Sequence, residues 1–231
     1  MSSAGFVPVE PERADAEARA RADAWKSAQI AVAQRALADI ELARWRKGER
    51  VAPFDAFLHL LRSIDPAPDS ILEIGSGSGY YAELLDAADL GAIPYYGLDY
   101  SPAMLEIARA RVPRGTFALG DAEHLHLPDR MHDLVVSGCV MVHLADWRAS
   151  IREAARVSRR WVMIHRLQTV LSGPERTFSK EAYGERCFER WFALRDVLQA
   201  CESAGLRLMR SASVAEAPDY TIASYLMEKA T

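Results

Sequence analysis

Between residues 70 and 165, short apolar runs alternate with segments that have the spacing of helices. This alternation predicts a doubly wound, mostly parallel α/β sheet, because each connection between parallel strands must cross the sheet and is usually a helix. Helices are therefore expected on both faces of the sheet. The expected strands are 70–74, 94–98, 115–119, 133–137 and 160–165, and the expected helices are 79–89, 102–111 and 146–157.

The segment before this alternation is rich in Ala, Arg and Glu. Residues 1–10 have no apolar periodicity and are expected to lack regular structure. Residues 11–47 and 53–61 are expected to form helices, so residues 1–61 are interpreted as a helical extension of the same domain. This extension either helps to close a cleft or packs elsewhere for stability or dimerisation. One helix face is expected to carry an apolar stripe that packs near that cleft, formed by Trp25, Ala28, Val32, Ala36 and Ile40.

The segment after the alternation completes the main domain, which is expected to span residues 62–231. Residues 166–187 are polar and are interpreted as an insert, and a helix is expected near 188–204. No helix fits between the apolar runs 206–214 and 220–228, so these two runs should pair as an antiparallel hairpin.

Charge and cysteine content exclude several classes of protein. The formal net charge is −4 and no long run of like charge occurs, so nucleic acid and membrane surfaces are not expected as partners. The three cysteines form no CxxC pair, which argues against a disulfide framework and against a structural zinc site. No signal peptide or membrane span is evident, and a cytoplasmic location is expected.

A glycine-rich turn follows the first expected strand. Gly75, Gly77 and Gly79 occupy alternate positions after Ile71–Ile74, and a helix follows. Glycines allow a sharp turn and let a ligand lie against the backbone, while the next helix offers free N–H groups. A dinucleotide fingerprint would need a small residue at position 80, which is Tyr80. The turn therefore favours a cofactor site but not a dinucleotide site.

Two aspartates follow later strands at the same edge of the expected sheet. Asp99 ends the strand 94–98 and lies 20 residues beyond Gly79. One strand–helix–strand unit fits between them, so Asp99 should lie beside the glycine turn and could accept hydrogen bonds from both hydroxyls of a ribose. Asp121 follows the strand 115–119 and could bind the exocyclic amine of an adenine.

These motifs together resemble the class I S-adenosylmethionine-dependent methyltransferases, in their small-molecule branch. Glu73–Gly79 matches the first motif of that family, Leu98–Met104 the second, and Gly120–Glu123 the third. The stretch Asp133–Leu144 matches the fourth strand and its loop. The resemblance implies a Rossmann-like fold, with the terminal hairpin supplying the antiparallel last strand, and it implies S-adenosyl-L-methionine as cofactor and S-adenosyl-L-homocysteine as product.

The resemblance also implies roles for individual residues. Asp99 would hold the ribose, and Asp121 would take the adenine amine. The methionine part of the cofactor would lie against the glycine turn and near the backbone of Cys139. The residues assigned to the cofactor on this basis are Glu73, Gly75, Gly77, Gly79, Asp99, Tyr100, Met104, Asp121, Ala122 and Cys139.

Two histidines are the candidate catalytic residues. His143 follows the fourth strand of the alternation and His165 ends the fifth, so both should lie where the sheet opens to a ligand. The ordinary pKa of histidine suits proton removal near neutral pH. No metal is expected, because Ser137 and His165 stand where the metal-dependent branch has acidic ligands. His124, His126 and His132 are interpreted as residues of an exposed loop.

Three functions remain open. The first is a methyltransferase that acts on a small polar metabolite held by His143, His165 and the insert 166–187, in a monomer or a homodimer. The second is an NAD(P)-dependent oxidoreductase, which Tyr80 and the terminal hairpin oppose. The third is a non-catalytic, regulatory S-adenosylmethionine-binding protein. The sequence does not distinguish O-, N- and C-methylation.

Overall fold

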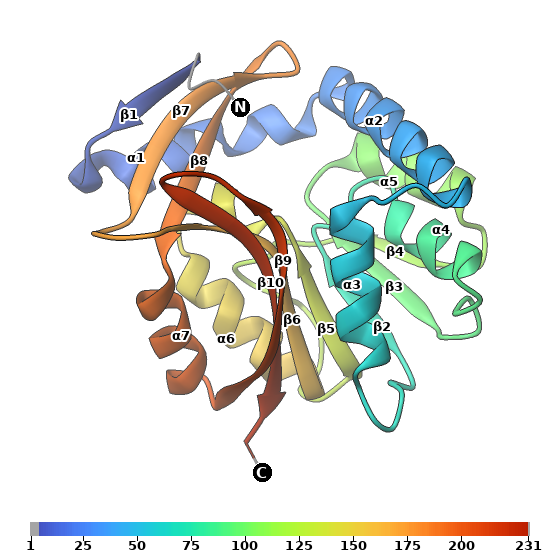
Figure 1. The fold of residues 1–231 in the computed structure, drawn as a ribbon. Coiled ribbons are helices and arrows are strands. Elements are labelled where there is room, and N and C mark those ends of the chain that lie inside the picture. The colour runs from blue at the N-terminus through green and yellow to red at the C-terminus, as the bar shows by residue number, and fades with distance from the viewer. Residues whose placement is uncertain (1–4, 231) are drawn as a thin grey trace.

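A computed structural model describes residues 5–230, and its centre is one curved sheet flanked by helices (Figure 1). The strand order is β1-β7-β8-β6-β5-β2-β3-β4, and β10 pairs with both β6 and β9. The strands are β1 (Phe6–Val9), β2 (Ile71–Ile74), β3 (Tyr95–Asp99), β4 (Thr116–Leu119), β5 (His132–Gly138), β6 (Ser158–Val170), β7 (Arg176–Ala182), β8 (Glu185–Ala193), β9 (Leu206–Glu216) and β10 (Tyr220–Lys229).

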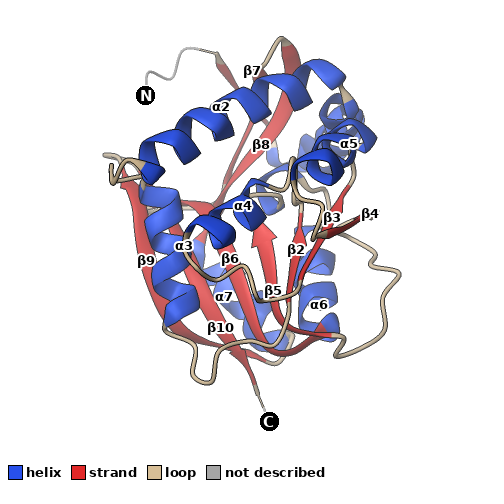
Figure 2. Ribbon diagram, turned by 90° about the vertical axis from the view of Figure 1, so that its right-hand side faces the viewer, coloured by secondary structure: helices blue, strands red, loops and turns tan. Residues whose placement is uncertain are grey.

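The helices lie in layers on the two faces of this sheet (Figures 1 and 2). The helices are α1 (Ala14–Arg21), α2 (Ala28–Arg46), α3 (Ala52–Arg62), α4 (Tyr80–Ala87), α5 (Pro102–Arg111), α6 (Trp147–Val157) and α7 (Leu194–Ser203). The expected doubly wound α/β architecture is confirmed, since β4, β3, β2, β5 and β6 run parallel to their neighbours in this order. Helix α5 has the bounds expected from the sequence, and Ser101 caps it by accepting a hydrogen bond from the Met104 N–H.

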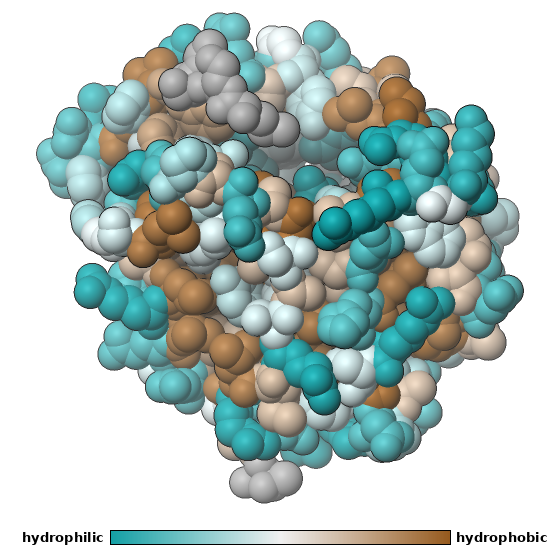
Figure 3. Space-filling model, viewed as in Figure 1, coloured by the Kyte–Doolittle hydropathy of each residue, from teal (hydrophilic) through white to brown (hydrophobic). Residues whose placement is uncertain are grey.

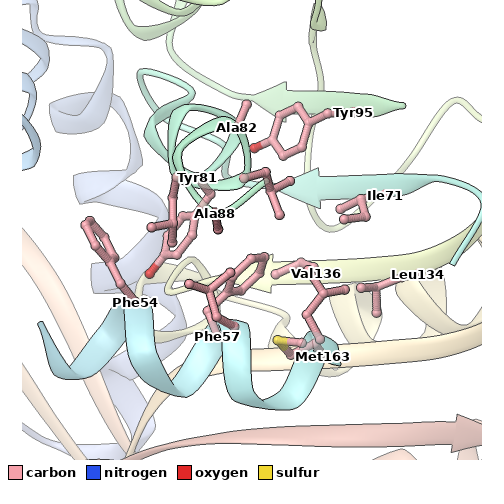
Figure 4. Close-up of a cluster of buried hydrophobic side chains, with 14 of the residues drawn as sticks. Phe54, Phe57, Ile71, Tyr81, Ala82, Ala88, Tyr95, Leu134, Val136 and Met163 are labelled. Carbon is pink, nitrogen blue, oxygen red and sulfur yellow. The ribbon is translucent and has the colours of Figure 1, made fainter. Parts of the chain in front are cut away.

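Alternate residues of the central strands enter two separate cores. Ile71 of β2 and Val136 of β5 pack with α3, α4 and α5, whereas Leu72 and Val135 pack with α6 and α7. This division follows from the period-two geometry of a strand, and burial on both faces explains why these strands are continuously apolar. Figure 4 shows the first core, where the rings of Phe54, Phe57 and Tyr81 meet. Each buried phenylalanine contributes about 1.5–3 kcal/mol to stability.

The apolar stripe expected on the N-terminal helix is wrong. Helix α2 buries Ile30, Ala38 and Leu42, while Val32 and Ile40 are 66% and 57% exposed. The break at Ser27, whose backbone is extended, separates Trp25 in the 3₁₀ turn Ala22–Lys26 from α2. Within α2 the other stripe residues do share one face, but that face is exposed and the face with Ile30, Ala38 and Leu42 packs on the domain.

Two segments expected to be irregular or helical are strands. Residues 6–9 form β1, which pairs antiparallel with β7, so the expectation of no structure is wrong there. The first four residues of that expectation lie outside the described residues. Within the insert, β7 and β8 form a hairpin around Tyr183 and Gly184, both with positive φ, and Ala182 pairs with Glu185. Two positive φ values in a two-residue loop are the signature of a type I′ hairpin turn.

The hairpin extends into the region expected to be helical. Strand β8 continues to Ala193, so α7 begins only at Leu194, and the N-terminal part of the helix expected at 188–204 is wrong. Phe188 and Phe192 are almost completely buried in this strand, and burial against neighbouring segments favours the extended conformation. The terminal hairpin is confirmed, because β9 pairs antiparallel with β10.

Candidate active site

A cavity of about 600 Å³ lies at the carboxyl ends of β2, β3 and β5. This volume is in the range of small-molecule sites, about 300–1,000 Å³. The surface is hollowed between α1 and α2 near the top of the view in Figure 3. The wall is completed by residues from distant segments: Ala18, Arg19, Ala22, Trp25, Gln34, Leu37, Ala38 and Glu41 from the N-terminal part, and Lys180, Ala182, Tyr183 and Glu189 from the β7–β8 hairpin.

The glycine turn forms one side of the cavity, and its three glycines have different surroundings. Gly75 and Gly77 line the cavity, and both have positive φ. A Cβ on Gly75 would lie 2.7 Å from the Val140 Cβ, whereas a Cβ on Gly77 would meet only the Met104 Sδ, at 4.0 Å. Gly79 does not line the cavity, and a Cβ there would meet the Phe117 ring at 2.9 Å. Gly79 therefore allows close packing beneath the turn, and the structure does not support its assignment to the cofactor.

Asp99 joins the second strand of the motif to the glycine turn. Its Oδ2 accepts a hydrogen bond of 2.7 Å from the Gly77 N–H, and its Oδ1 accepts one of 2.8 Å from the Ser101 N–H. Burial raises the pKa of this carboxyl, although the backbone hydrogen bonds oppose the shift. The side chain lines the cavity. Each carboxylate oxygen keeps a lone pair that can accept from a ligand hydroxyl.

The residues assigned to adenine lie along the same wall. Tyr100, Met104, Asp121 and Ala122 all line the cavity. The Tyr100 hydroxyl donates to Asp23 Oδ1 at 3.1 Å, and this contact joins the wall to the N-terminal segment. Asp121 is exposed, and its Oδ1 accepts a hydrogen bond from the Glu123 N–H. The Asp121 carboxylate and the apolar side chain of Met104 therefore line the part of the cavity to which the adenine ring is assigned.

Glu73 lies beneath the turn and not in the cavity wall. Its side chain is 2% exposed, and its Oε2 accepts a hydrogen bond from the Tyr95 hydroxyl. Burial raises the pKa of Glu73 to about 8. Gly138 leaves room for this carboxyl, since a Cβ there would collide with it. The structure supports Glu73 as a residue that shapes the turn, and gives it no contact with the cavity.

Cys139 and His143 follow β5 and line the cavity. The Cys139 N–H donates to the His165 carbonyl oxygen at 3.1 Å, and its φ is 60°. His143 Nδ1 donates to the Phe188 carbonyl oxygen at 2.7 Å, which leaves Nε2 as the nitrogen with the lone pair. Burial lowers the pKa of His143 to about 4. The expected titration near neutral pH is therefore not supported, and His143 is a neutral imidazole at pH 7.

His165 is held in the apolar interior. Its ring is 1% exposed, it packs against Phe57, and it does not line the cavity. One ring nitrogen is hydrogen-bonded to the Tyr81 hydroxyl and the other to the Ser224 hydroxyl at 2.8 Å. Burial keeps the pKa of His165 well below its usual value. The structure thus does not support a catalytic role, because both ring nitrogens are engaged away from the cavity.

The neighbouring residue Arg166 turns to the cavity. Its Nη1 donates to the Tyr80 hydroxyl at 3.4 Å, and both residues are part of the cavity wall. Gln168 also lines the wall, and no hydrogen bond to its buried Oε1 occurs among residues 5–230. On the β7–β8 hairpin, Lys180 is paired with Glu189, so these two side chains neutralise each other.

The N-terminal segment that covers the cavity is held by a buried ion network. Arg35 of α2 is 7% exposed and pairs with Glu83 of α4 and with Asp39. Arg111 of α5 pairs with the same two carboxylates, at 3.2 and 2.9 Å. Removal of one member from such a network leaves a buried charge without a partner, which is destabilising. The network therefore locks α2 onto the helices that follow the cofactor motifs.

Some wall residues were not identified from the sequence. Glu41 reaches the cavity from α2 and Lys180 from the β7–β8 hairpin, and the position of both depends on long-range packing that local patterns do not contain. Trp25 is the one residue of the expected apolar stripe that lines the cavity, where its ring lies 4.3 Å from that of His143 between centroids. The one local sign of the hairpin that carries Lys180 is Gly184, since glycine readily adopts the positive φ of a tight turn.

The described residues contain neither a group that could hold a metal ion nor a helix that could span a membrane. Among residues 5–230 no group of three or more His, Cys, Asp or Glu side chains is arranged to hold a metal ion. His124 and His126 are exposed and pack edge to face with each other. The expectation of an exposed loop is wrong for His132, which begins β5, is buried and packs against Tyr96, because the strand starts one residue earlier than expected. None of the helices described here combines the length and the apolar character that crossing a membrane requires.

Comparison with curated proteins covers the central part of the chain. Residues 72–161 match the family model of the methyltransferase domain. The demethylmenaquinone methyltransferase of Thermotoga maritima is 36% identical over 93 residues, which are 40% of each chain. The malonyl-[acyl-carrier protein] O-methyltransferase of Serratia marcescens is 27% identical over 154 residues, 65% of this chain and 59% of that protein. The chain thus spans about 40% to 59% of the length of these two relatives.

Comparison with solved structures covers the whole chain. The crystal structure of Burkholderia thailandensis 1,6-didemethyltoxoflavin-N1-methyltransferase, with bound 1,6-didemethyltoxoflavin and S-adenosylhomocysteine, has a TM-score of 0.65 at 16% identity and covers 100% of this chain and 98% of that one. A methyltransferase from Methanosarcina mazei has a TM-score of 0.61 at 14% identity, covering 75% and 97%. At these identities the likeness concerns the fold. The matched part of the chain is thus similar to methyltransferase domains, which agrees with the resemblance of its motifs to the class I S-adenosylmethionine-dependent methyltransferases.

Proposed function

We propose that this chain transfers the methyl group of S-adenosylmethionine to a small polar metabolite. The observation that carries the proposal is the position of Asp99, which binds the Gly77 N–H at 2.7 Å and lines the cavity together with Asp121. A carboxylate between a glycine turn and a second acidic residue suits a ligand with a ribose in its middle. The T. maritima and S. marcescens relatives carry methyltransferase names, which agrees with this activity.

The residues along the cavity wall fit the ribose, adenine and methionine parts of the cofactor in the positions that the resemblance implies. The free lone pairs of Asp99 would accept from the two ribose hydroxyls, and the carboxylate of Asp121 would accept from the adenine amine. Met104 would pack on one face of the ring. The bare backbone at Gly75 and Gly77 would lie against the methionine part, and the N-terminus of α4 would face it.

The contribution of the protein to methyl transfer is mainly to position the two reactants. The sulfonium of the cofactor supplies an activated methyl group when bound. Residues of the chain must exclude water and hold the acceptor in line with that group. Trp25 and the ion network of α2 contribute to closure, since both place the N-terminal segment over the cavity. Neutral His143 can accept a hydrogen bond at Nε2 and thereby orient an acceptor hydroxyl or amine.

The proposal includes the organisation of the domain. Residues 1–61 form one wall of the site and act as its cover, residues 62–231 form the methyltransferase domain, and the β7–β8 hairpin supplies acceptor contacts. A cytoplasmic location is also part of it, which the free cysteines Cys139, Cys187 and Cys201 support.

Calorimetric titration of the protein with S-adenosylhomocysteine and with NADH tests the cofactor assignment. We expect binding of the first and none of the second. A screen for label transfer from methyl-labelled cofactor over a metabolite library then separates an enzyme from a non-catalytic binding protein. Binding of NADH in preference, or cofactor binding without transfer to any library member, would contradict the proposed activity.

A further inference from the structure

Among residues 5–230, the half-buried Arg166 differs from the buried arginines Arg35 and Arg190 in having no ion-paired acidic partner. Arg35 is paired with Glu83 and Asp39, and Arg190 with Asp15 and Glu175. Arg166 makes no ion pair within residues 5–230. Its single side-chain hydrogen bond in that part of the chain is the one of 3.4 Å to the Tyr80 hydroxyl. A guanidinium has five N–H donors, so most of them are available to a ligand in the cavity.

The backbone around Arg166 is built to direct this side chain. Leu167 pairs with Ala223 and Ile164 with Tyr225, so two residues of β6 face the single residue Ser224 of β10. This arrangement is a β-bulge, a feature that turns a side chain and is common beside active sites. Arg166 has a φ of 60°, and its N–H donates to the Ser224 hydroxyl at 3.3 Å. A non-glycine residue in the left-handed region costs stability, which is consistent with a functional constraint.

The order of strands places Arg166 at the acceptor end of the cavity. Strand β5 lies between β2 and β6, while β3 and β4 lie on the opposite side of β2. The proposed cofactor would extend along the sheet edge from its ribose at Asp99 on β3 to its methionine part at the glycine turn after β2. Strand β6 lies farther along the same edge, on the side of the methionine part and away from the ribose. Arg166 touches Tyr80, the first residue after that turn, and so lies next to the region where the methyl group would be.

We propose that Arg166 binds a carboxylate of the methyl acceptor and that a carboxylate oxygen receives the methyl group, giving a methyl ester. This inference rests on the proposed methyltransferase function. A lone pair of the carboxylate oxygen forms the new O–CH₃ bond, the S–CH₃ bond breaks, and its electron pair stays on sulfur. The anionic acceptor becomes a neutral ester and the cationic sulfonium a neutral thioether, so charge is balanced and no proton is removed.

This reaction matches the groups found around the cavity. A carboxylate is already ionised at neutral pH, so its methylation needs no general base. His143 suits that requirement, since its lowered pKa makes it a poor base. Gln168 presents an amide in the same wall that can hydrogen-bond a further polar group of the acid. The fork of Arg166 can hold the carboxylate through two parallel hydrogen bonds.

The first test measures binding to the complex with S-adenosylhomocysteine. The probes are malonate, trans-aconitate, benzoate and phenylacetate, each compared with its neutral amide by calorimetry. We expect at least one acid to bind about 10-fold or more tightly than its amide, and Arg166→Gln to weaken that acid by about 10–100-fold. Arg166→Lys keeps the charge and should lose less. Arg195→Gln removes an equal charge from an exposed site on α7 and should behave as the wild type.

The second test locates the transferred methyl group. Label from the cofactor should appear as methanol after mild alkaline hydrolysis of the product, since a methyl ester is labile to base. Label that stays bound after this treatment is on nitrogen, on carbon or on an ether oxygen and would overturn the proposal, as would equal binding of every acid and its amide.

The same variants separate this inference from the proposed function. Affinity for S-adenosylhomocysteine should stay within about 3-fold of the wild type in Arg166→Gln, because the ribose and adenine contacts are elsewhere. A loss of more than about 10-fold would show that Arg166 binds the carboxylate of the cofactor itself and would overturn the acceptor assignment. If the wild type binds no S-adenosylhomocysteine, the proposed function fails and this inference fails with it. Transfer to a neutral amine alone overturns the inference and leaves the function standing.

Discussion

The two halves of the cavity are built in different ways. The proposed cofactor half comes mainly from one continuous stretch, residues 71–122, in which the glycine turn, Asp99 and Asp121 lie at strand ends. The proposed acceptor half combines the N-terminal segment, the loop after β5, strand β6 with Arg166 and the β7–β8 hairpin, which come from separate parts of the sequence. The first half mainly uses backbone and carboxylates, whereas the second uses aromatic and charged side chains.

This difference shows which parts of the site the fold dictates. Adjacent parallel strands bring Gly77 and Asp99 together whatever the rest of the chain does, since the register of β2 and β3 determines their distance. No comparable register joins Trp25 to His143 or Arg166 to Tyr80. The acceptor half can therefore vary without disturbing the cofactor half, and variants in the two halves should have separable effects.

The largest effect is expected for Asp99→Ala in the cofactor half. Loss of two charge-assisted hydrogen bonds, each about 1.5–3 kcal/mol, should weaken S-adenosylhomocysteine binding by about 100-fold or more. The variant also removes the acceptor for the Gly77 N–H. Calorimetry should show a smaller loss for Asp99→Asn, which keeps one acceptor oxygen. Unchanged affinity in both variants would remove Asp99 from the cofactor half.

The next effect concerns acid stability and belongs to the acceptor half. The pKa of His143 is lowered from 6.5 to about 4 in the folded protein, so the unfolded chain takes up this proton first as the pH falls. Stability is thus complete above pH 6.5 and declines toward pH 4, by roughly 2–3 kcal/mol at pH 4.5. Urea unfolding measures the free energy of unfolding at each pH. For His143→Gln this free energy should not show the decrease of roughly 2–3 kcal/mol that we assign to His143.

The matched control for this prediction is His59→Gln, which changes an exposed histidine of α3. It should keep the full acid response of the wild type. If His143→Gln keeps that response as well, or if its activity profile loses a titration near pH 7, the neutral state assigned to His143 is wrong.

A third prediction separates backbone geometry from steric fit in the glycine turn. Gly75→Ala and Gly205→Ala both place alanine at positive φ, but only the first meets a neighbour, with its Cβ 2.7 Å from Val140. Gly75→Ala should therefore lose about 1–3 kcal/mol more unfolding free energy than Gly205→Ala, the typical cost of overpacking. Denaturant titration measures both. Equal losses would mean that the β5 loop moves away freely and does not define the turn.

The smallest effect is expected for Trp25→Ala, which opens the cover of the acceptor half. Loss of the contact with His143 should lower kcat/KM for the acceptor found in the library screen by about 10-fold, because water enters and the acceptor is held less well. Affinity for S-adenosylhomocysteine should change less. Trp45→Ala is the control, since Trp45 lies farther along α2 and outside the cavity wall. The idea of a cover fails if the two variants have the same kcat/KM.

By itself the sequence determined the central sheet, and it predicted the residues of the proposed cofactor half. The alternation of apolar runs predicted β2 to β6 and their helices, because buried strands and amphipathic helices have different periods. Asp99 could be placed beside Gly77 because one strand–helix–strand unit has a nearly constant geometry. Ser101 predicted the start of α5 by its capping hydroxyl.

Only the tertiary structure decided the acceptor half. The sequence places His143 and His165 at the ends of central strands, yet His143 reaches the cavity, whereas His165 lies inside β6 and is enclosed by Phe57 and Tyr81. The direction of a side chain at a strand end depends on bulges and on neighbouring elements, which local periodicity does not contain. Long-range packing likewise decided which face of α2 is buried, and β8 became a strand through burial against distant segments. Long-range packing therefore determines which charged and aromatic groups line the proposed acceptor half, whereas local patterns predict the residues of the proposed cofactor half.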